Sequence, residues 1–212
     1  MEGYVANNNS PQQDTVIRWY PMRIFHSSIK RQNELNELLA KEVSIERTYV
    51  PKSLIDPEKK TYISTLVNYI FLNTSLKSLK EIKVNKIRYE HLRYVMNTGC
   101  DEHYNPTSEI AYVPNKQMED FIRVIESGNE HVLMIENLDF AFKPGQKVRI
   151  TQGVFEGVEG ILKSIKKHIA VVIPIKNIMP VAIINVQKKI HTEVGNRLNI
   201  FNKNQNNSSA QS

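Results

Sequence analysis

The chain has 212 residues, a formal net charge of +6 and 41% hydrophobic residues, which predicts one or two soluble globular domains. No apolar run approaches the roughly 20 residues of a membrane-spanning helix, and the N-terminus lacks the basic start and apolar block of a secretory signal. The single cysteine, Cys100, excludes a disulfide within the chain and indicates a reducing compartment. We therefore expect a cytoplasmic protein.

The positive charge is concentrated in one segment. Residues 1–141 carry 17 Lys+Arg and 19 Asp+Glu, residues 142–190 carry 9 and 2, and residues 191–212 carry 2 and 1. The three balances, −2, +7 and +1, add up to the net charge of +6. A concentrated positive field attracts phosphate groups, but small barrels also expose lysines for solubility. Composition alone leaves both interpretations open.

The first folded unit is expected at residues 16–128, after a polar stretch at 1–15 whose composition predicts disorder. Alternation from Val16 to Ile24 predicts a strand, in which Pro21 indicates an edge position or an irregularity. A helix should follow, capped by Ser27 or Ser28 and running to about Val43.

The rest of this unit alternates between strand and helix patterns. Short strands are expected at 47–50 and 92–96, and a longer, β-branched and aromatic strand at 62–72. Leu76, Leu79 and Ile82 lie three apart and predict a short helix; a last helix should begin with Asn115 as its cap and end near Gly128. The order β-α-β-β-α-β-α predicts an α+β sandwich of one sheet with helices.

A linker is expected at 129–141, a small barrel at 142–190 and a mostly disordered tail at 191–212. Four of the eight glycines, Gly145, Gly153, Gly157 and Gly160, interleave with an alternating strand pattern at 147–151. Strands interrupted by glycine at short intervals favour a sharply turned barrel over an open sheet. Further strands are expected at 158–165, 169–175 and 180–186.

The sequence offers no pattern of an active site. It has no phosphate loop, dinucleotide fingerprint or HExxH motif, and its serines lack a G-x-S-x-G context. Cys100 and His103 lie close in sequence, but two potential ligands in a loop are far more often incidental than a metal site. We expect no enzyme, no metal and no cofactor.

Three segments, in this order, resemble the NusG/RfaH family of transcription elongation factors. They are Ile17-Arg18-Trp19-Tyr20, the run Leu66–Phe71 (LVNYIF) and the run Pro144–Gly157 (PGQKVRITQGVFEG), which is similar to the KOW motif of SH3-like barrels. Within the family the chain is most similar to the UpxY antiterminators of capsular polysaccharide loci, on the runs 19–23, 76–81 and 112–122.

The resemblance implies a NusG-type N-terminal α/β domain, with an antiparallel sheet and helices, followed by a KOW β-barrel. It implies a factor that binds the clamp helices of the largest RNA polymerase subunit and suppresses pausing and termination, in an operon-specific manner if the UpxY similarity holds. The positions that match the family's polymerase-binding patch are Trp19, Tyr20, Leu66, Tyr69 and Phe71. The matching KOW positions are Gly145, Lys147, Arg149, Gly153, Phe155, Gly157 and Gly160.

The residues that match the polymerase-binding patch allow two interpretations, an interface or a core. Aromatic anchors suit protein interfaces, but the same residues suit a core. Because alternate residues of a strand face opposite sides, Tyr69 and Phe71 should share one face and Ile70 the other, and one of these sets should be core. Leu66-Val67 replaces the family's Phe-Pro, and Lys80-Glu81-Ile82 stands where RfaH contacts the polymerase gate loop, which puts that contact in doubt.

The barrel carries the remaining alternatives. The run 170–175 is β-branched and contains Pro174, so we expect a constitutive barrel and not the helical state known in RfaH. In NusG the barrel docks Rho or a small-subunit ribosomal protein, and the sequence does not choose between them. The rivals are a housekeeping NusG and a KOW-type RNA- or ribosome-binding protein, whose candidate nucleic-acid contacts are Lys163, Lys166, Lys167, Lys188 and Lys189.

Overall fold

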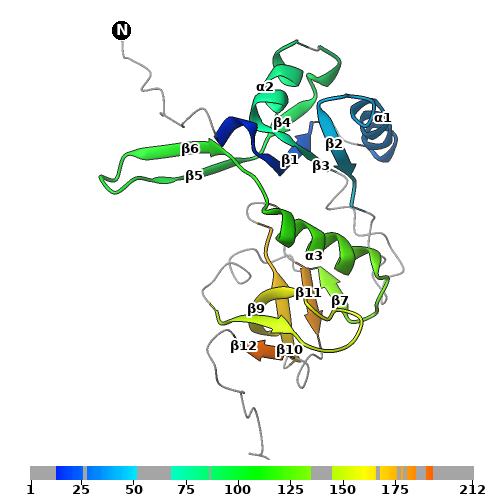
Figure 1. Ribbon diagram of the computed structural model, residues 1–212, viewed down its shortest axis with the longest axis vertical. Coiled ribbons are helices and arrows are strands. Elements are labelled where there is room, and N and C mark those ends of the chain that lie inside the picture. Colours follow the sequence, from blue (N-terminus) through cyan, green and yellow to red (C-terminus); the bar gives the residue numbers. More distant parts are fainter. Residues whose placement is uncertain are drawn as a thin grey trace, which may run out of the picture. The chain divides into compact units, whose positions relative to one another are not determined.

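The computed structural model describes residues 13–25, 28–51, 68–85, 87–134, 145–165, 168–175, 178, 181–184 and 190–192. The chain divides into two compact units, residues 1–128 with 175–179, and residues 129–174 with 180–212 (Figure 1). Several predictions lie outside the described residues: Leu66, Lys166, Lys167, Lys188, Lys189, part of the linker and most of both termini expected to be disordered.

The first unit is built on a four-stranded antiparallel sheet. Its strands are β1 (Ile17–Ile24), β2 (Ile45–Tyr49), β3 (Tyr69–Ser75) and β4 (Leu92–Tyr94), in the order β2-β3-β1-β4. All four match strands expected from the sequence, although β3 begins its described part at Tyr69. The expectation of an edge position for β1 is wrong, because β1 is a central strand between β3 and β4.

Pro21 fits into this central strand because of the direction in which its missing N–H would point. The Ile24 N–H donates toward β3, to the Asn68 carbonyl, and the Phe25 N–H donates toward β4, to the His91 carbonyl. Successive residues alternate in this way, so Pro21 faces the β4 side, like Phe25. There, β4 pairs only with Met22 to Ile24, and proline therefore removes no ladder hydrogen bond.

The helices of this unit are α1 (Ile29–Leu39), α2 (Leu76–Asn85) and α3 (Asn115–Glu126), with short 3-10 turns at Gln13–Thr15 and Ile87–Tyr89. The predicted Ser28 cap is confirmed, since the Arg31 N–H donates to the Ser28 Oγ at 3.1 Å. The helix ends four residues before the expected Val43. Asn115 is the first helical residue and not the cap, because Pro114 takes the capping position without a side-chain hydrogen bond.

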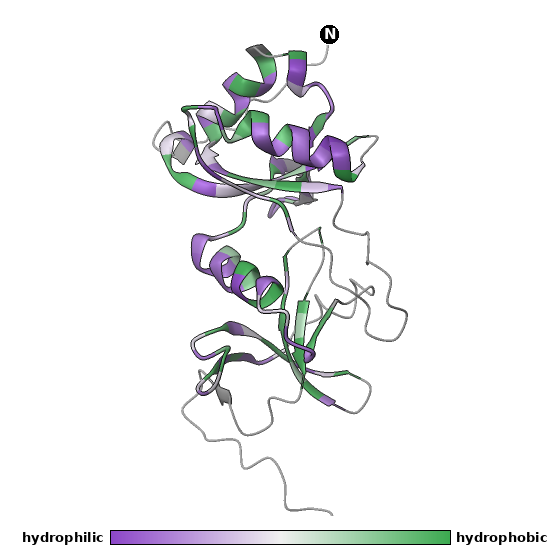
Figure 2. Ribbon diagram, turned by 90° about the vertical axis from the view of Figure 1, so that its right-hand side faces the viewer, coloured by the Kyte–Doolittle hydropathy of each residue, from purple (hydrophilic) through white to green (hydrophobic). Residues whose placement is uncertain are grey.

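Helices cover both faces of the first sheet. On one face, Tyr20, Met22, Ile70 and Leu72 pack with buried residues of α1 and α2 in one hydrophobic cluster. On the other face, Phe71 contacts Tyr49 of β2 and Phe121 of α3, with ring centroids 6.2 and 6.0 Å apart. Hydrophobic and hydrophilic residues lie on different sides of α3 (Figure 2), as expected for a helix that covers a sheet.

The sequence did not predict a two-stranded hairpin in this unit. It consists of β5 (Met96–Cys100) and β6 (Pro106–Ile110), which pair from Met96 opposite Ile110 to Cys100 opposite Pro106. The hairpin extends from the body of the first unit (Figure 1), and its residues are exposed or half-buried. Because neither of its faces is covered, it has no alternation of apolar and polar residues from which to predict it.

The second unit contains a six-stranded antiparallel sheet in the order β12-β8-β9-β10-β11-β7. The four expected strands are present as β8 (Lys147–Ile150), β9 (Glu159–Ile165), β10 (His168–Ile173) and β11 (Val181–Ile184). Two further strands come from the predicted linker, β7 (Val132–Met134), and the predicted tail, β12 (Ile190–Thr192). Among the described residues no pairing joins β12 to β7, so closure into a barrel stays a prediction.

Candidate partner-binding surfaces

The residues expected to bind polymerase are mostly interior. Trp19 and Tyr20 are each 2% exposed and Phe71 is fully buried. Tyr20 belongs to the cluster with α1 and α2, and α3 packs on Phe71. These three side chains therefore have almost no exposed surface with which to contact a partner. Tyr69 is half-buried and is the one described member of the set that retains substantial accessible surface.

The register explains why Tyr69 and Phe71 differ although they share a face. Tyr69 lies opposite Arg23, and Phe71 lies opposite Pro21, on neighbouring strands β3 and β1. Phe71 is covered by Phe121, whereas the row through Tyr69 continues to Arg23 and then to Arg93 of β4, both of which are exposed. Sequence alternation gave the correct face but not the position at which α3 covers it.

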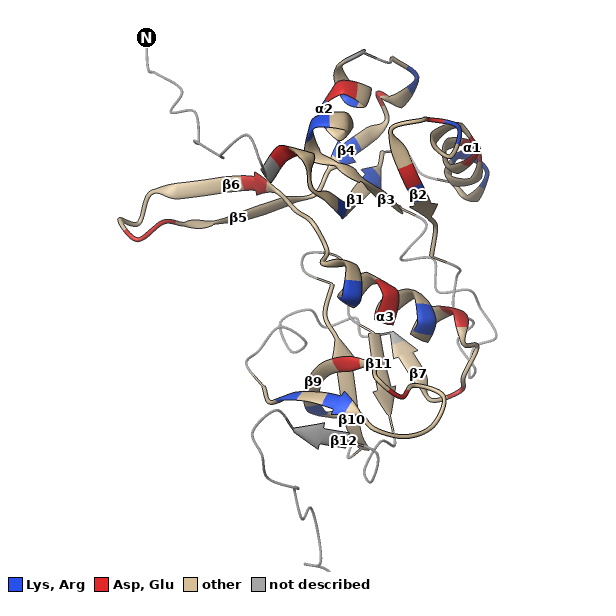
Figure 3. Ribbon diagram, viewed as in Figure 1, with Lys and Arg blue, Asp and Glu red and all other residues tan. Residues whose placement is uncertain are grey.

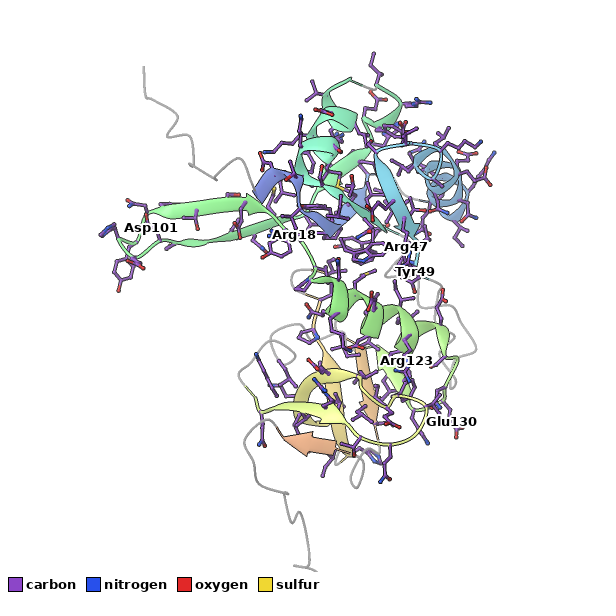
Figure 4. The ribbon with its side chains drawn as sticks, in the orientation of Figure 1. Arg18, Arg47, Tyr49, Asp101, Arg123 and Glu130 are labelled. Carbon is purple, nitrogen blue, oxygen red and sulfur yellow. The ribbon has the colours of Figure 1, made fainter. Side chains whose placement is uncertain are left out.

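Arginines lie over aromatic rings at several places in this unit. The Arg18 guanidinium carbon is 4.2 Å from the Tyr112 ring centroid, and that of Arg47 is 5.4 Å from the Trp19 centroid (Figure 4 labels both arginines). The Arg93 guanidinium lies 5.7 Å from the ring of Phe25, a large hydrophobic residue that is 52% exposed. Such contacts each contribute about 0.5–1 kcal/mol at exposed sites.

The tip of the β5–β6 hairpin is held by one carboxylate. Asp101 accepts hydrogen bonds from the N–H groups of His103 and Asn105, each at 2.8 Å, and from Asn105 Nδ2 at 2.9 Å. These bonds, those with Asn105 first, lower the pKa of Asp101. The turn holds Tyr104 at a φ of 61° with its side chain 87% exposed. The hairpin contains Asp101, Glu102 and Glu109 but no Lys or Arg (Figure 3).

The four glycines of the KOW-like segment serve two different purposes. Gly153 and Gly157 have φ angles of 88° and 84°, a left-handed conformation that other residues rarely adopt. Gly145 and Gly160 lie in close approaches instead. A Cβ on Gly160 would come within 2.5 Å of the Val172 carbonyl oxygen, and one on Gly145 within 2.5 Å of Ile161 Cγ2. Substitution is therefore restricted at all four positions.

Among the described residues, the basic segment 142–190 has fewer side chains available to bind nucleic acid than its sequence predicts. Phe155 is 7% exposed and belongs to the interior, so its ring is not available for base stacking. Arg149 of β8 forms an ion pair with Glu159 of β9, although both side chains remain accessible. Lys147 is exposed and Lys163 half-buried. With Lys166 and Lys167 outside the described residues, no continuous basic surface is defined.

The described ranges contain several potential metal ligands, among them Cys100 and His103. Within them, no group of three His, Cys, Asp or Glu side chains is placed to hold a metal ion. Cys100 is a free, exposed thiol near the hairpin tip. No helix among the described residues is both long and apolar enough to cross a membrane.

Comparisons with known proteins show similarity to solved structures. No protein-family model and no curated protein matches the chain. The chain is similar to a solved structure described as "Domain interaction in Thermotoga maritima NusG", with 16% sequence identity and a TM-score of 0.39 over 84% of this chain and 98% of that one. At this identity and TM-score the similarity carries no argument about function, which has to come from the residues.

Proposed function

We propose that the protein is a NusG-like transcription elongation and antitermination factor that binds RNA polymerase through its first unit. The observation that carries this proposal is the ordered resemblance of three segments to that family. Two of the segments become neighbours in the fold, since β1 with Trp19-Tyr20 pairs along its length with β3, which begins at Tyr69. Residues distant in sequence thus belong to one sheet, in which Trp19 and Tyr20 are interior and Tyr69 remains accessible.

The third segment supports the same proposal. The KOW-like glycines lie in a separate antiparallel sheet, where left-handed turns at Gly153 and Gly157 and close approaches at Gly145 and Gly160 each require glycine. Ala170 to Ile173 are in strand β10, in agreement with the expected β state of this module. A two-unit chain of this kind suits a factor whose first unit binds polymerase and whose second unit binds another component.

The finer proposal is that the factor acts on particular operons, as UpxY antiterminators do at capsular polysaccharide loci. Its support is the sequence similarity at residues 19–23, 76–81 and 112–122. The neighbouring genes test it directly. A polysaccharide operon beginning with this gene is expected, whereas a neighbourhood of translocation and ribosomal-protein genes would identify a housekeeping factor instead.

Binding to purified core RNA polymerase tests the main proposal. The wild-type chain should bind, and Tyr69→Ala should weaken binding on the order of tenfold or more, because aromatic anchors dominate protein interfaces. Tyr104→Ala is the matched control, since it removes an exposed tyrosine from the hairpin tip. The fluorescence of Trp19, the only tryptophan and a buried one, checks that both variants remain folded.

Two outcomes would contradict the proposal. Absence of wild-type binding to polymerase would exclude it. Tight binding to RNA with a steep salt dependence, without polymerase binding, would favour a KOW-type RNA-binding protein. If polymerase binds, a pause assay on a single template should show fewer and shorter pauses with the wild type than with Tyr69→Ala at equal concentration.

A further inference from the structure

Arg23 and Arg93 lie directly opposite each other on β1 and β4. Both are exposed, and directly opposed residues of an antiparallel pair have Cβ atoms about 4.5–5.5 Å apart. Like charges at this position destabilise a sheet. Within the described residues neither arginine forms an ion pair with a carboxylate, so no described side chain relieves the repulsion through an ion pair.

One further cation, Lys83, and one carboxylate, Glu90, lie near Arg93. Lys83 of α2 donates through Nζ to the carbonyls of Tyr89 and Leu92, at 2.8 and 2.7 Å, which fixes a third cation close to the base of β4. Burial first, and then the charge of Arg93, lower the pKa of Lys83, whereas the charge of Glu90 acts to raise it. Arg93 donates Nη1 to the carbonyls of Glu90 and Leu92. These bonds orient its guanidinium, which has five N–H donors in total.

The pair also lies beside two accessible aromatic side chains, Tyr69 and Phe25. Tyr69, Arg23 and Arg93 form one row across three neighbouring strands, because Arg23 is paired with both of the others. Phe25 follows the end of β1, and its exposed ring lies under the Arg93 guanidinium. The result is an arginine pair flanked by one half-buried and one exposed aromatic side chain.

We propose that Arg23 and Arg93 bind carboxylate side chains of the protein that docks beside Tyr69. Arginine forks pair bidentately with carboxylates and phosphates alike, so the charge around them decides between the two. The first unit, residues 1–128 with 175–179, carries 18 Lys+Arg and 16 Asp+Glu, a net charge of +2. A near-neutral unit lacks the broad positive field with which proteins attract a polyanion, whereas arginine among aromatics is typical of protein interfaces.

This inference rests on the proposed function for its partner, RNA polymerase. In equilibrium binding to core polymerase, Arg23→Gln should weaken binding on the order of tenfold. Arg23→Lys should recover only part of the loss, because it keeps the charge without the fork. Lys77→Gln, on the exposed side of α2, is the matched control and should bind like the wild type.

The melting temperature distinguishes a binding role of Arg23 from a structural role, because the two roles predict changes of opposite sign. Arg23→Gln removes the cross-strand repulsion and should raise the melting temperature, although it weakens binding. A gain that disappears in high salt would identify the repulsion as its cause. A lower melting temperature together with weaker binding would overturn the proposal, since Arg23 would then be a structural residue.

Two probes separate failure of this inference from failure of the proposed function. If the wild type does not bind polymerase, the full chain and its Arg23→Gln variant are compared with poly-L-glutamate and with single-stranded oligothymidylate. Weaker binding of the variant to polyglutamate would uphold the carboxylate site. A loss confined to oligothymidylate would assign the pair to nucleic acid and overturn the proposal, and so would equal binding of both proteins to each probe.

Discussion

Two buried tyrosines of the first unit should respond in opposite directions to the same substitution, Tyr→Phe. The Tyr89 hydroxyl donates to Glu42 Oε1 at 2.6 Å, and Arg88 pairs with the same Glu42 oxygen at 3.3 Å. Among the described residues, the Tyr49 hydroxyl is buried and has no hydrogen-bond partner. Hydrogen bonds to charged groups contribute about 1.5–3 kcal/mol, and a buried unsatisfied polar group costs about 1–3 kcal/mol.

We therefore expect Tyr89→Phe to lower the free energy of unfolding by about 1.5–3 kcal/mol and Tyr49→Phe to raise it by about 1 kcal/mol. Urea titrations followed by the fluorescence of Trp19 measure both, because this single tryptophan lies in the first unit and reports on its unfolding. Equal m-values would show that the unfolded states are comparable. Destabilisation by Tyr49→Phe of more than 1 kcal/mol would refute the reasoning, because its hydroxyl would then have a partner.

Two further predictions concern the second unit and alkaline pH. In circular dichroism melts, Gly160→Ala should lower the free energy of unfolding by about 2–3 kcal/mol, because its Cβ would lie 2.5 Å from a backbone oxygen. Gly157→Ala should lower it by about 1–2 kcal/mol, because only its φ of 84° is unfavourable for alanine. A larger loss for Gly157→Ala than for Gly160→Ala would contradict this reasoning. Burial and the hydrogen bond with Glu42 raise the pKa of Tyr89 to about 12. Because the unfolded state loses this proton near pH 10, the free energy of unfolding should fall by up to about 2–3 kcal/mol as the pH rises from about 10 to about 12. Lys83, with its lowered pKa, acts in the opposite direction, so the wild type is compared with Tyr89→Phe, which should show less of the fall.

The fold could be predicted from the sequence wherever one face of an element is apolar. Helix α3 and strand β8 alternate clearly between buried and exposed residues, and both were expected. Strand β3 is buried on both faces, so periodicity could not separate an interface residue such as Tyr69 from an interior residue such as Phe71. Of the two alternatives expected for Pro21, an edge position or an irregularity, the edge position is wrong. Whether a strand tolerates proline depends on which neighbouring strand the missing N–H would face.

The sequence predicted the aromatic residues of the candidate site but not its arginine pair. The aromatic members, Tyr69 among them, could be found by their resemblance to a family, because they lie within short contiguous runs. The Arg23–Arg93 pair joins two strands that are distant in the sequence, and it exists only through their register. Neither arginine stands out in the sequence, because a single exposed arginine on a strand is ordinary.

The two units differ in how their charges can be used. The second unit carries 10 Lys+Arg and 6 Asp+Glu, which is +4 of the chain's net charge of +6. Because Arg149 is paired with Glu159 and Phe155 is buried, this excess suits attraction to phosphate more than reading of bases. In the near-neutral first unit, charges act only within about 8 Å at physiological salt, and the row of Tyr69, Arg23 and Arg93 can select a partner only on contact. Under the proposed function, recognition by the first unit depends on the shape and register of one sheet face, and substitutions at Tyr69, Arg23 or Arg93 are expected to change partner binding through contacts made at that face.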